Sequence, residues 1–337
     1  MNYSGIDLHS NNSVIVVSDE TDHVLCQRRV PNDLAVVLRT LEPYRQEIVG
    51  VVVESTYNWY WLVDGLQAAG YTVHLANTAA MKRYEGLKYS DDETDAAYLA
   101  QLLRLGILPT GYICPIEQRG LRDLARKRLQ LSRSRTQHIL AVESNVARQT
   151  GGRIGSRAVK ALTEETLKRF GLIENVTAAM AANVAVIQTL NVQIAKLEAR
   201  LRAQVRPHAE FKLLTSAPGV GEILATTVML ETASIERFAG VGNFASYARC
   251  VDSKRVSNGK KKGEGNVKNG NRYLAWAFVE AANFARRYCP EAKRFYERKK
   301  TRTNNIVATK ALAHKLARAC YHMMKERKPF DAKRCFA

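Results

Sequence analysis

The chain has 337 residues and a formal net charge of +19, with 46% hydrophobic and 8% aromatic residues. This length allows two or three domains with a substantial core, and the composition is ordinary for a soluble protein. No run of about 18 consecutive apolar residues occurs, so we expect no membrane-spanning segment. The N-terminus lacks the basic and apolar regions of a signal peptide, and the six scattered cysteines show no CxxC or zinc spacing. We therefore expect a cytoplasmic protein with reduced cysteines.

The charge is unevenly distributed along the chain. Counting Lys and Arg against Asp and Glu gives −6 in residues 1–115, +8 in residues 116–248 and +17 in residues 249–337. This pattern indicates a carboxylate-rich first part joined to a surface that binds a polyanion, of which nucleic acid is the most common. A basic helix on a membrane surface fits less well, because much of the charge lies in a glycine-rich loop.

The first part of the chain alternates strand and helix patterns. We expect a β-hairpin from the apolar runs near the N-terminus, then a helix, a buried strand, a second helix and a further strand. The segments are 5–9, 13–17, 24–26, 33–41, 48–53, 59–69 and 71–76. This order predicts an α/β domain with a mixed sheet over residues 1–115.

Carboxylates occur at the ends of these predicted elements. Asp7 ends the first strand, and Glu54 ends an apolar strand, where a carboxylate is costly to bury unless it is paired or binds a metal. The stretch from Tyr89 to Ala100 brings four carboxylates in five residues onto the first turn of a helix, and Asp92 and Asp95 share one face of it.

This arrangement is typical of ribonuclease-H-type nucleases, in which acids from two strands and a helix converge on two divalent ions. Such a pair of ions, Mg²⁺ or Mn²⁺, clamps the attacking and leaving oxygens of a phosphoryl transfer. The alternative is that each acid only caps a helix or lies on the surface.

From residue 116 to residue 208 the pattern is helical. Residues 119–135 form a basic amphipathic helix. Apolar residues then step by three and four, as in a coiled-coil seam, at Ile187, Leu190, Ile194, Leu197 and Leu201. An intramolecular helical hairpin and a dimerising coiled coil explain this spacing equally well.

The last part, residues 209–337, opens with a turn between two short helices. Pro218-Gly219-Val220-Gly221 is the turn of a helix-hairpin-helix, and Gly219 and Gly221 would let backbone amides approach a phosphate. Any tight connection between helices can carry the same residues, so this motif alone is only a moderate signal of phosphate binding. Two further helices are expected over 272–285 and 304–324.

A polar, basic segment lies between them, at residues 252–271. It is too rich in Gly and Asn to bury a core, and as a loop it can follow a phosphate backbone. Its cations are Lys254, Arg255, Lys260, Lys261, Lys262 and Lys268. Ser257 among them is a candidate nucleophile toward phosphate, with the cations stabilising the developing charge. The residues alone favour the simpler interpretation that Ser257 only turns the loop.

Taken in order, these motifs resemble the DEDD transposases of the insertion sequence 110/1111 family, with the related Piv-type DNA invertases. The resemblance covers nearly the whole chain. It rests on Gly5-Ile6-Asp7, Val53-Glu54-Ser55-Thr56, Asp92 to Ala96, Ala217 to Gly221 and the segment from Ser253 to Leu274.

The resemblance implies a RuvC-like nuclease domain whose metal-binding tetrad is Asp7, Glu54, Asp92 and Asp95. It also implies a C-terminal transposase domain whose Ser257 forms a covalent bond to DNA at a composite site. Family members act as tetramers on donor and target double-stranded DNA, guided by a non-coding RNA of the element. Here Asn258 separates the serine from Gly259, where some relatives have Ser-Gly directly, so Ser253 is the alternative nucleophile.

We therefore expect an α/β + α protein that excises and inserts a mobile element. A ribonuclease-H/RuvC-like domain would be followed by a helical coiled-coil middle and a C-terminal helical transposase domain. The first rival is a RuvC-like, structure-specific DNA nuclease that uses metal-activated water and no serine. The second is a catalytically silent nucleic-acid-binding protein, in which the carboxylates would be dispensable.

Overall fold

The computed structural model describes residues 1–81, 91–252, 255–263 and 269–336. The chain forms two compact units, Met1–Ile113 and Cys114–Ala337. Each unit has its own hydrophobic core. The predicted boundary between a helical middle domain and a last domain, after residue 208, stays a prediction.

The first unit is built on a mixed six-stranded sheet in the part of the chain described, with strand order β3-β2-β1-β4-β5-β6. The strands are β1 Asn2–Leu8, β2 Asn12–Ser18, β3 Val24–Pro31, β4 Ile48–Glu54, β5 Val73–Ala76 and β6 Thr110–Gly111. β1, β2 and β3 are antiparallel neighbours, whereas β4 runs parallel to both β1 and β5. The predicted α/β class and the N-terminal hairpin are therefore confirmed.

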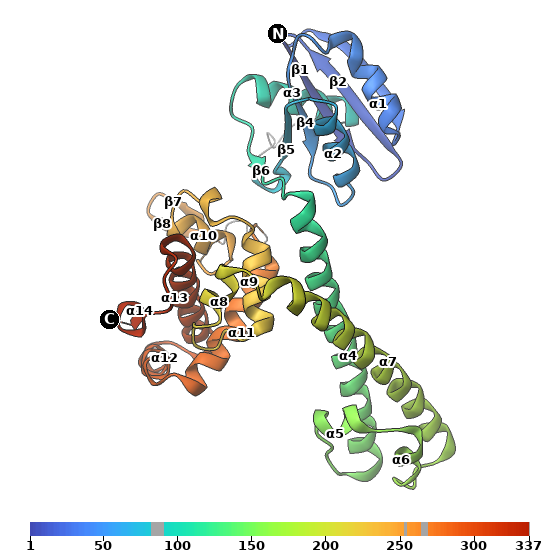
Figure 1. Cartoon of the computed structure of the whole chain (residues 1–337), viewed down its shortest axis with the longest axis vertical. Helices are drawn as coiled ribbons and strands as arrows, with labels where there is room; N and C mark the ends of the chain where they lie inside the picture. Colours follow the sequence, from blue (N-terminus) through green and yellow to red (C-terminus); the bar gives the residue numbers. More distant parts are fainter. Residues whose placement is uncertain (82–90, 253–254, 264–268, 337) are drawn as a thin grey trace. The chain divides into compact units, whose positions relative to one another are not determined.

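Helices cover the two faces of this sheet (Figure 1). On one face, α1 (Leu34–Leu41) and α2 (Tyr60–Ala68) bury Val37, Leu62 and Leu66 against Ile6 and Val53. On the other face, α3 (Asp92–Arg104) buries its apolar residues against alternate residues of the strands, as Ala96 does against Val14 and Val16. The period of two along each strand separates these two apolar faces.

The contact between α3 and β1 depends on Gly5. A Cβ added to Gly5 would lie only 2.0 Å from the carbonyl oxygen of Ala96. The absence of a side chain at this position lets the helix backbone approach the strand directly. This close approach sets where the first turn of α3, with its carboxylates, stands relative to β1.

The second unit begins with two long helices that pack against each other, α4 (Ile116–Thr150) and α7 (Glu174–Val205) (Figure 1). Between them lie α5 (Ser156–Ala161) and α6 (Glu164–Lys168). Ile187, Ile194 and Leu201 of the predicted seam are buried, and Arg128 of α4 forms an ion pair with Glu198 of α7. Within the chain, the seam is thus covered by a helical hairpin.

The remaining helices enclose the core of the second unit. They are α8 Ala209–Leu214, α9 Glu222–Thr232, α10 Val241–Tyr247, α11 Arg272–Tyr288, α12 Pro290–Arg302, α13 Asn305–Glu326 and α14 Ala332–Phe336. The core contains Phe244, Phe278 and Leu316, each fully buried. The helices predicted over 272–285 and 304–324 are confirmed as α11 and α13, and both begin with an asparagine N-cap.

The basic segment between α10 and α11, expected to be a loop, contains a β-hairpin. β7 (Arg255–Ser257) pairs antiparallel with β8 (Lys260–Gly263). Asn258 and Gly259 connect them with φ angles of 51° and 71°. Two successive positive φ angles are typical of a type I′ turn, which Asn-Gly favours strongly, and this local preference overrides the polarity of the segment.

Among the described helices, α7 is the one whose length and apolar composition would suffice to cross a membrane. Only 22% of its most apolar window is buried in the structure. The finding rests on length and composition alone.

Candidate active site

The end of β1 and the residue just after it carry two polar side chains. Asp7 lies in β1 and is only 3% exposed, and His9 is the first residue after Leu8, the last of the strand. The Nε2 atom of His9 lies 3.3 Å from Oδ2 of Asp7. A buried carboxylate and an imidazole therefore share the end of β1.

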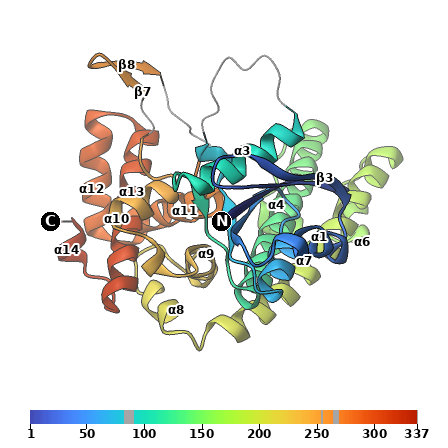
Figure 2. The same cartoon turned by 90° about the horizontal axis from the view of Figure 1, so that it is seen from above.

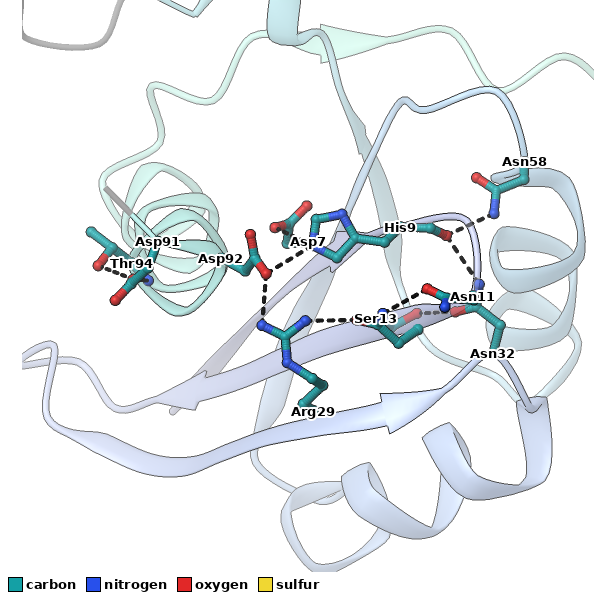
Figure 3. Close-up of polar contacts among 11 residues, drawn as sticks. Asp7, His9, Asn11, Ser13, Arg29, Asn32, Asn58, Asp91, Asp92 and Thr94 are labelled. Atoms are coloured by element: carbon teal, nitrogen blue, oxygen red, sulfur yellow. Dashed lines mark hydrogen bonds and ion pairs between the residues drawn. The ribbon is translucent and has the colours of Figure 1, made fainter. Parts of the chain in front are cut away.

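The first turn of α3 brings a second carboxylate to the same place. Asp91 is the N-cap and accepts a hydrogen bond from the backbone N–H of Thr94 at 2.8 Å. The helix dipole favours the negative charge of the following Asp92. Asp92 places Oδ2 3.1 Å from Nε2 of His9, and one ligand atom each of Asp7, His9 and Asp92 lie within 4.8 Å of one another (Figure 3).

The position of His9 is fixed by its main chain. Its carbonyl oxygen accepts hydrogen bonds from the side-chain amides of Asn32 at 3.0 Å and Asn58 at 2.9 Å. Asn32 is held in turn by the hydroxyl of Ser13, which donates to its Oδ1 at 2.7 Å. The turn after β1 is thus tied to two other loops, and these bonds set where the imidazole lies (Figure 3).

Asp92 also has a cationic neighbour on the sheet. Arg29 of β3 donates a hydrogen bond to Oδ2 of Asp92 at 2.6 Å and another to Oδ1 of Asn12 at 2.9 Å. The Arg29 guanidinium, with a smaller contribution from His9, holds the pKa of Asp92 below its ordinary value.

The other two predicted acids lie on the same face of the sheet. Ile6 pairs with Val53, so the next residues along these parallel strands, Asp7 and Glu54, are neighbours on β1 and β4. Glu54 and Asp95 line a cavity of about 210 Å³ beside α3, together with Tyr98, Thr78, Met81 and Leu99. Of the four predicted carboxylates, Asp7 and Asp92 belong to one cluster with His9, while Glu54 and Asp95 line this cavity.

The donor set fits a divalent cation. Nε2 of His9 is buried and makes no hydrogen bond of acceptable geometry within the described residues, although two carboxylate oxygens lie close to it. The carboxylate of Asp7 is nearly inaccessible to solvent, and burying it without a cation or donors would cost several kcal/mol, on the order of 3 or more. Two carboxylates and one imidazole suit Mn²⁺ or Mg²⁺, with imidazole favouring the softer Mn²⁺.

The candidate serine lies in the second unit, at the end of an exposed hairpin. Ser257 is the last residue of β7 and pairs with Lys260 across the turn. Ser257, Lys260 and Lys262 are exposed, and the hairpin projects beyond the helices of this unit (Figure 2). Arg255 and Lys261 lie in its strands, whereas Ser253, Lys254 and Lys268 lie outside the described residues.

The two glycines of the predicted phosphate-binding turn differ in their surroundings. Gly219 has a φ angle of +79°, and a Cβ there would lie 2.2 Å from the carbonyl oxygen of Ala281 in α11. Gly221 precedes α9 as its N-cap, and a Cβ there would meet nothing within 4 Å. Close packing on α11 explains Gly219, while the space at Gly221 is open to a ligand.

Comparison with known proteins places the whole chain in one group. A family described as transposase, the DEDD transposases of IS110, matches residues 4–150, and the transposase IS116/IS110/IS902 family matches residues 211–297. A probable family 20 transposase of Pseudomonas aeruginosa is 25% identical over 348 aligned positions, covering 96% of this chain and 97% of the relative. The chain belongs to the IS110 family of transposases.

Two insertion-element proteins are also similar to part of the chain. The uncharacterized 42 kDa protein of IS900 from Mycobacterium paratuberculosis is 28% identical over 151 residues, which cover 42% of this chain and 36% of that protein. The uncharacterized 43.6 kDa protein of IS110 from Streptomyces coelicolor is 27% identical over 144 residues, with 42% and 35% coverage.

Membership of the IS110 family makes this chain a DNA-acting enzyme. The first family match contains all four predicted carboxylates, and the second contains Gly219, Gly221 and Ser257. The predicted resemblance to these transposases is therefore confirmed.

Two side chains at the acidic centre, His9 and Arg29, are absent from the residues predicted as functional. His9 stands only two positions after Asp7, so its nearness in sequence was a signal that the two side chains could lie together. No local pattern in the sequence pointed to Arg29, because its contact with Asp92 depends on the pairing of β3 with β2 and on where α3 packs.

Proposed function

We propose that this transposase is a metal-dependent DNA recombinase that excises and inserts a mobile element. Its first unit would be a ribonuclease-H/RuvC-like nuclease domain, a proposal supported by the strand order and by α3 on the acidic face. The observation that carries the proposal is the convergence of Asp7, His9 and Asp92 within 4.8 Å in a DNA-acting family.

The metal would be held by Asp7 and Asp92, with His9 beside them, and by Glu54 and Asp95 at the adjoining cavity. A bound Mg²⁺ or Mn²⁺ supplies Lewis-acid polarisation of the scissile phosphate. The residues of the chain position the metal-binding side chains. Buried Asp7 and the first turn of α3 keep the carboxylates oriented, and the hydrogen bonds of Asn32 and Asn58 to the His9 carbonyl keep the imidazole in place.

Ser257 is the proposed nucleophile. Its Oγ would attack the phosphorus of the scissile phosphodiester, forming a phosphoserine bond while the bond from phosphorus to the leaving sugar oxygen breaks. The serine proton passes to solvent, and the leaving oxygen takes up a proton to become a hydroxyl. The exposed position of Ser257 at a turn, among lysines that can neutralise phosphate charge, supports this role.

The finer features of the proposal follow the resemblance. Donor and target double-stranded DNA and a non-coding guide RNA are proposed partners, supported by the charge of +17 over residues 249–337. A dimer or tetramer is proposed on the exposed apolar side chains of α7, Val186 and Val192, which the hairpin with α4 leaves uncovered. We propose a cytoplasmic location for such an assembly.

A plasmid recombination assay tests this function. The element's ends and flanking non-coding DNA are supplied in trans, and wild type is compared with Asp7→Asn, Glu54→Gln, Asp92→Asn and Asp95→Asn. We expect each variant to lose at least a hundredfold in recombination, because each removes a charge from the proposed metal site. Recombination that persists in all four variants would exclude the metal-dependent function and leave a nucleic-acid-binding role.

The Ser257→Ala variant distinguishes the recombinase from the second candidate function, a RuvC-like nuclease that uses metal-activated water. Such a nuclease would keep cleaving DNA in this variant and lose cleavage only with the carboxylates. The recombinase would lose strand joining in both kinds of variant.

A further inference from the structure

A second basic surface lies away from the serine hairpin, in a groove between α4 and the start of α11. The groove encloses about 880 Å³. Its long wall is one face of α4, formed by Asp123, Arg126, Lys127, Leu129, Gln130, Arg133, Ser134 and Gln137, and its end wall is Arg272 and Tyr273. None of these residues is among the proposed catalytic or nucleic-acid-binding residues above.

The lining is polar and positively charged. It has four cations and one carboxylate, Asp123. Lys127, Arg133 and Arg272 are exposed, and none of the three makes an ion pair within the described residues. Such a concentration of uncompensated charge on a concave surface attracts a polyanion.

The end wall is preorganised by a buried carboxylate. Glu231 of α9 is 4% exposed and accepts two hydrogen bonds from Arg126, at 2.6 and 2.7 Å. Asn271, the N-cap of α11, donates to the same carboxylate at 2.7 Å. The Glu231 carboxylate therefore links α4 to the N-cap of α11. This network holds the two walls of the groove in place without a ligand.

The single aromatic ring of the groove is already covered. The guanidinium carbons of Arg126 and Arg272 lie 4.7 and 5.0 Å from the centroid of the Tyr273 ring. A single-stranded nucleic acid is held largely by bases stacked on aromatic rings, and the one ring lining this groove is half-buried and already has two guanidinium neighbours. A duplex is held instead by cations along its phosphate backbones.

The length of the groove fits a duplex. The α4 face from Asp123 to Gln137 spans about 21 Å at 1.5 Å per residue. A duplex of that length carries about six phosphates on each strand, so several lie within reach of the three exposed cations. Gln130, Ser134 and Gln137 supply neutral hydrogen-bond donors between them.

We infer that the α4–α11 groove binds the phosphate backbone of duplex DNA, without reading its sequence. The inference rests on the transposase function only for the choice of DNA as the polyanion. It concerns binding, so it does not depend on the metal or on Ser257.

The test measures binding of a fluorescent random-sequence duplex by anisotropy over a series of salt concentrations, with no divalent metal present. The full-length triple variant Lys127→Ala/Arg133→Ala/Arg272→Ala is compared with wild type. Each lost phosphate contact lowers the slope of log K against log salt by about 0.9, so the triple variant should bind on the order of 100-fold more weakly near 0.15 M salt, with a slope shallower by about 2.7.

The matched control removes the same charge elsewhere in the unit. Lys168→Ala/Lys196→Ala/Arg200→Ala changes three exposed cations of α6 and α7 that do not line the groove. Its affinity should fall less than about tenfold, as expected for a loss of net charge alone. The charge-keeping variant Lys127→Arg/Arg133→Lys/Arg272→Lys should bind like wild type, and circular dichroism checks that all three variants fold.

The inference is overturned if the groove variant binds duplex DNA no worse than the control variant. It is also overturned if the groove variant loses an RNA hairpin from the element's non-coding end while keeping the duplex, since the groove would then serve RNA. Asp7→Asn separates this test from that of the proposed function. That variant should bind the duplex like wild type even where it cannot recombine.

Discussion

At the scale of single residues, the acidic centre depends on His9 as well as on carboxylates. Its buried Nε2 lies 3.1 Å from Asp92 and 3.3 Å from Asp7, which makes it either a ligand or the partner that orients two ligands. Imidazole prefers Mn²⁺ over Mg²⁺ more strongly than carboxylate does. The identity of residue 9 should therefore tune the choice of metal.

We predict that His9→Ala weakens Mn²⁺ binding by about tenfold or more and affects Mg²⁺ less. The measurement is a calorimetric titration of each metal into wild type and variant. Asn11→Ala, an exposed change two residues away, is the control and should bind both metals like wild type. Equal losses for the two metals, or none, would show that the imidazole does not contact the cation.

A second prediction concerns pH and the C-terminal helix. Glu326 accepts hydrogen bonds from Arg334 of α14 at 2.6 and 2.7 Å, and this contact, with His322, lowers the pKa of Glu326 from 4.5 to about 2. A lowered carboxyl pKa stabilises the folded state above the ordinary value. That stabilisation is then lost as the pH falls from about 4.5 toward about 2.

The measurement is urea unfolding of wild type and Glu326→Gln at several pH values. The stability difference should be full at pH 7 and shrink steadily below pH 4.5. A difference that stays constant down to pH 3 would mean that the carboxylate contributes through packing and not through its charge.

At the scale of elements, the site is a consequence of how closely α3 approaches β1. Gly5→Ala would place a Cβ 2.0 Å from the carbonyl oxygen of Ala96 and push the helix outward. We predict a loss of stability of about 1–3 kcal/mol, the usual cost of overpacking, and a loss of recombination because Asp92 moves away from Asp7.

Chemical denaturation and the plasmid assay measure these two effects. Gly120→Ala is the matched control, because a Cβ there meets nothing within 4 Å on an exposed turn of α4. It should leave activity unchanged and raise stability by up to about 1 kcal/mol. If the Gly5→Ala variant is stable and active, α3 can accommodate a methyl group at position 5 without displacing Asp92, which contradicts this prediction.

The serine hairpin gives the other prediction at this scale. Gly259→Val would place a β-branched residue at a φ angle of 71°, at a cost of about 1–3 kcal/mol, and should unfold the turn beside Ser257. Asn258→Gly keeps both positive φ angles and serves as the control. We expect recombination to fall at least tenfold in Gly259→Val and to persist in Asn258→Gly. Equal activity of the two variants would show that recombination does not depend on this turn.

The elements also show what the sequence can and cannot predict. Alternating apolar residues and an acidic first turn follow local rules, so the sheet and α3 were predictable, while the role of the four acids stays a prediction. The contact of Arg29 with Asp92 and the Glu231 network that fastens α11 join residues 63 and 40 positions apart or more. Such contacts depend on tertiary packing, which local patterns do not carry.

At the scale of the whole molecule, opposite charges are divided between the two units. The acidic centre belongs to Met1–Ile113, while the basic groove and the serine hairpin belong to Cys114–Ala337. Under the proposed function, the first unit supplies the acids that would hold the metal, and the second unit supplies the nucleophilic serine and the cations that would bind DNA.

The proposed recombinase needs both Ser257 and the metal-binding acids to cut and join DNA. The most direct measurement is a denaturing gel that traps a covalent protein–DNA adduct from labelled element ends, with wild type, Asp7→Asn, Asp92→Asn and Ser257→Ala. We predict an adduct with wild type and Mg²⁺ or Mn²⁺ that maps to Ser257 by mass spectrometry, and none with the three variants or with chelator. An adduct that persists in Ser257→Ala, or recombination by that variant without any adduct, would contradict the account.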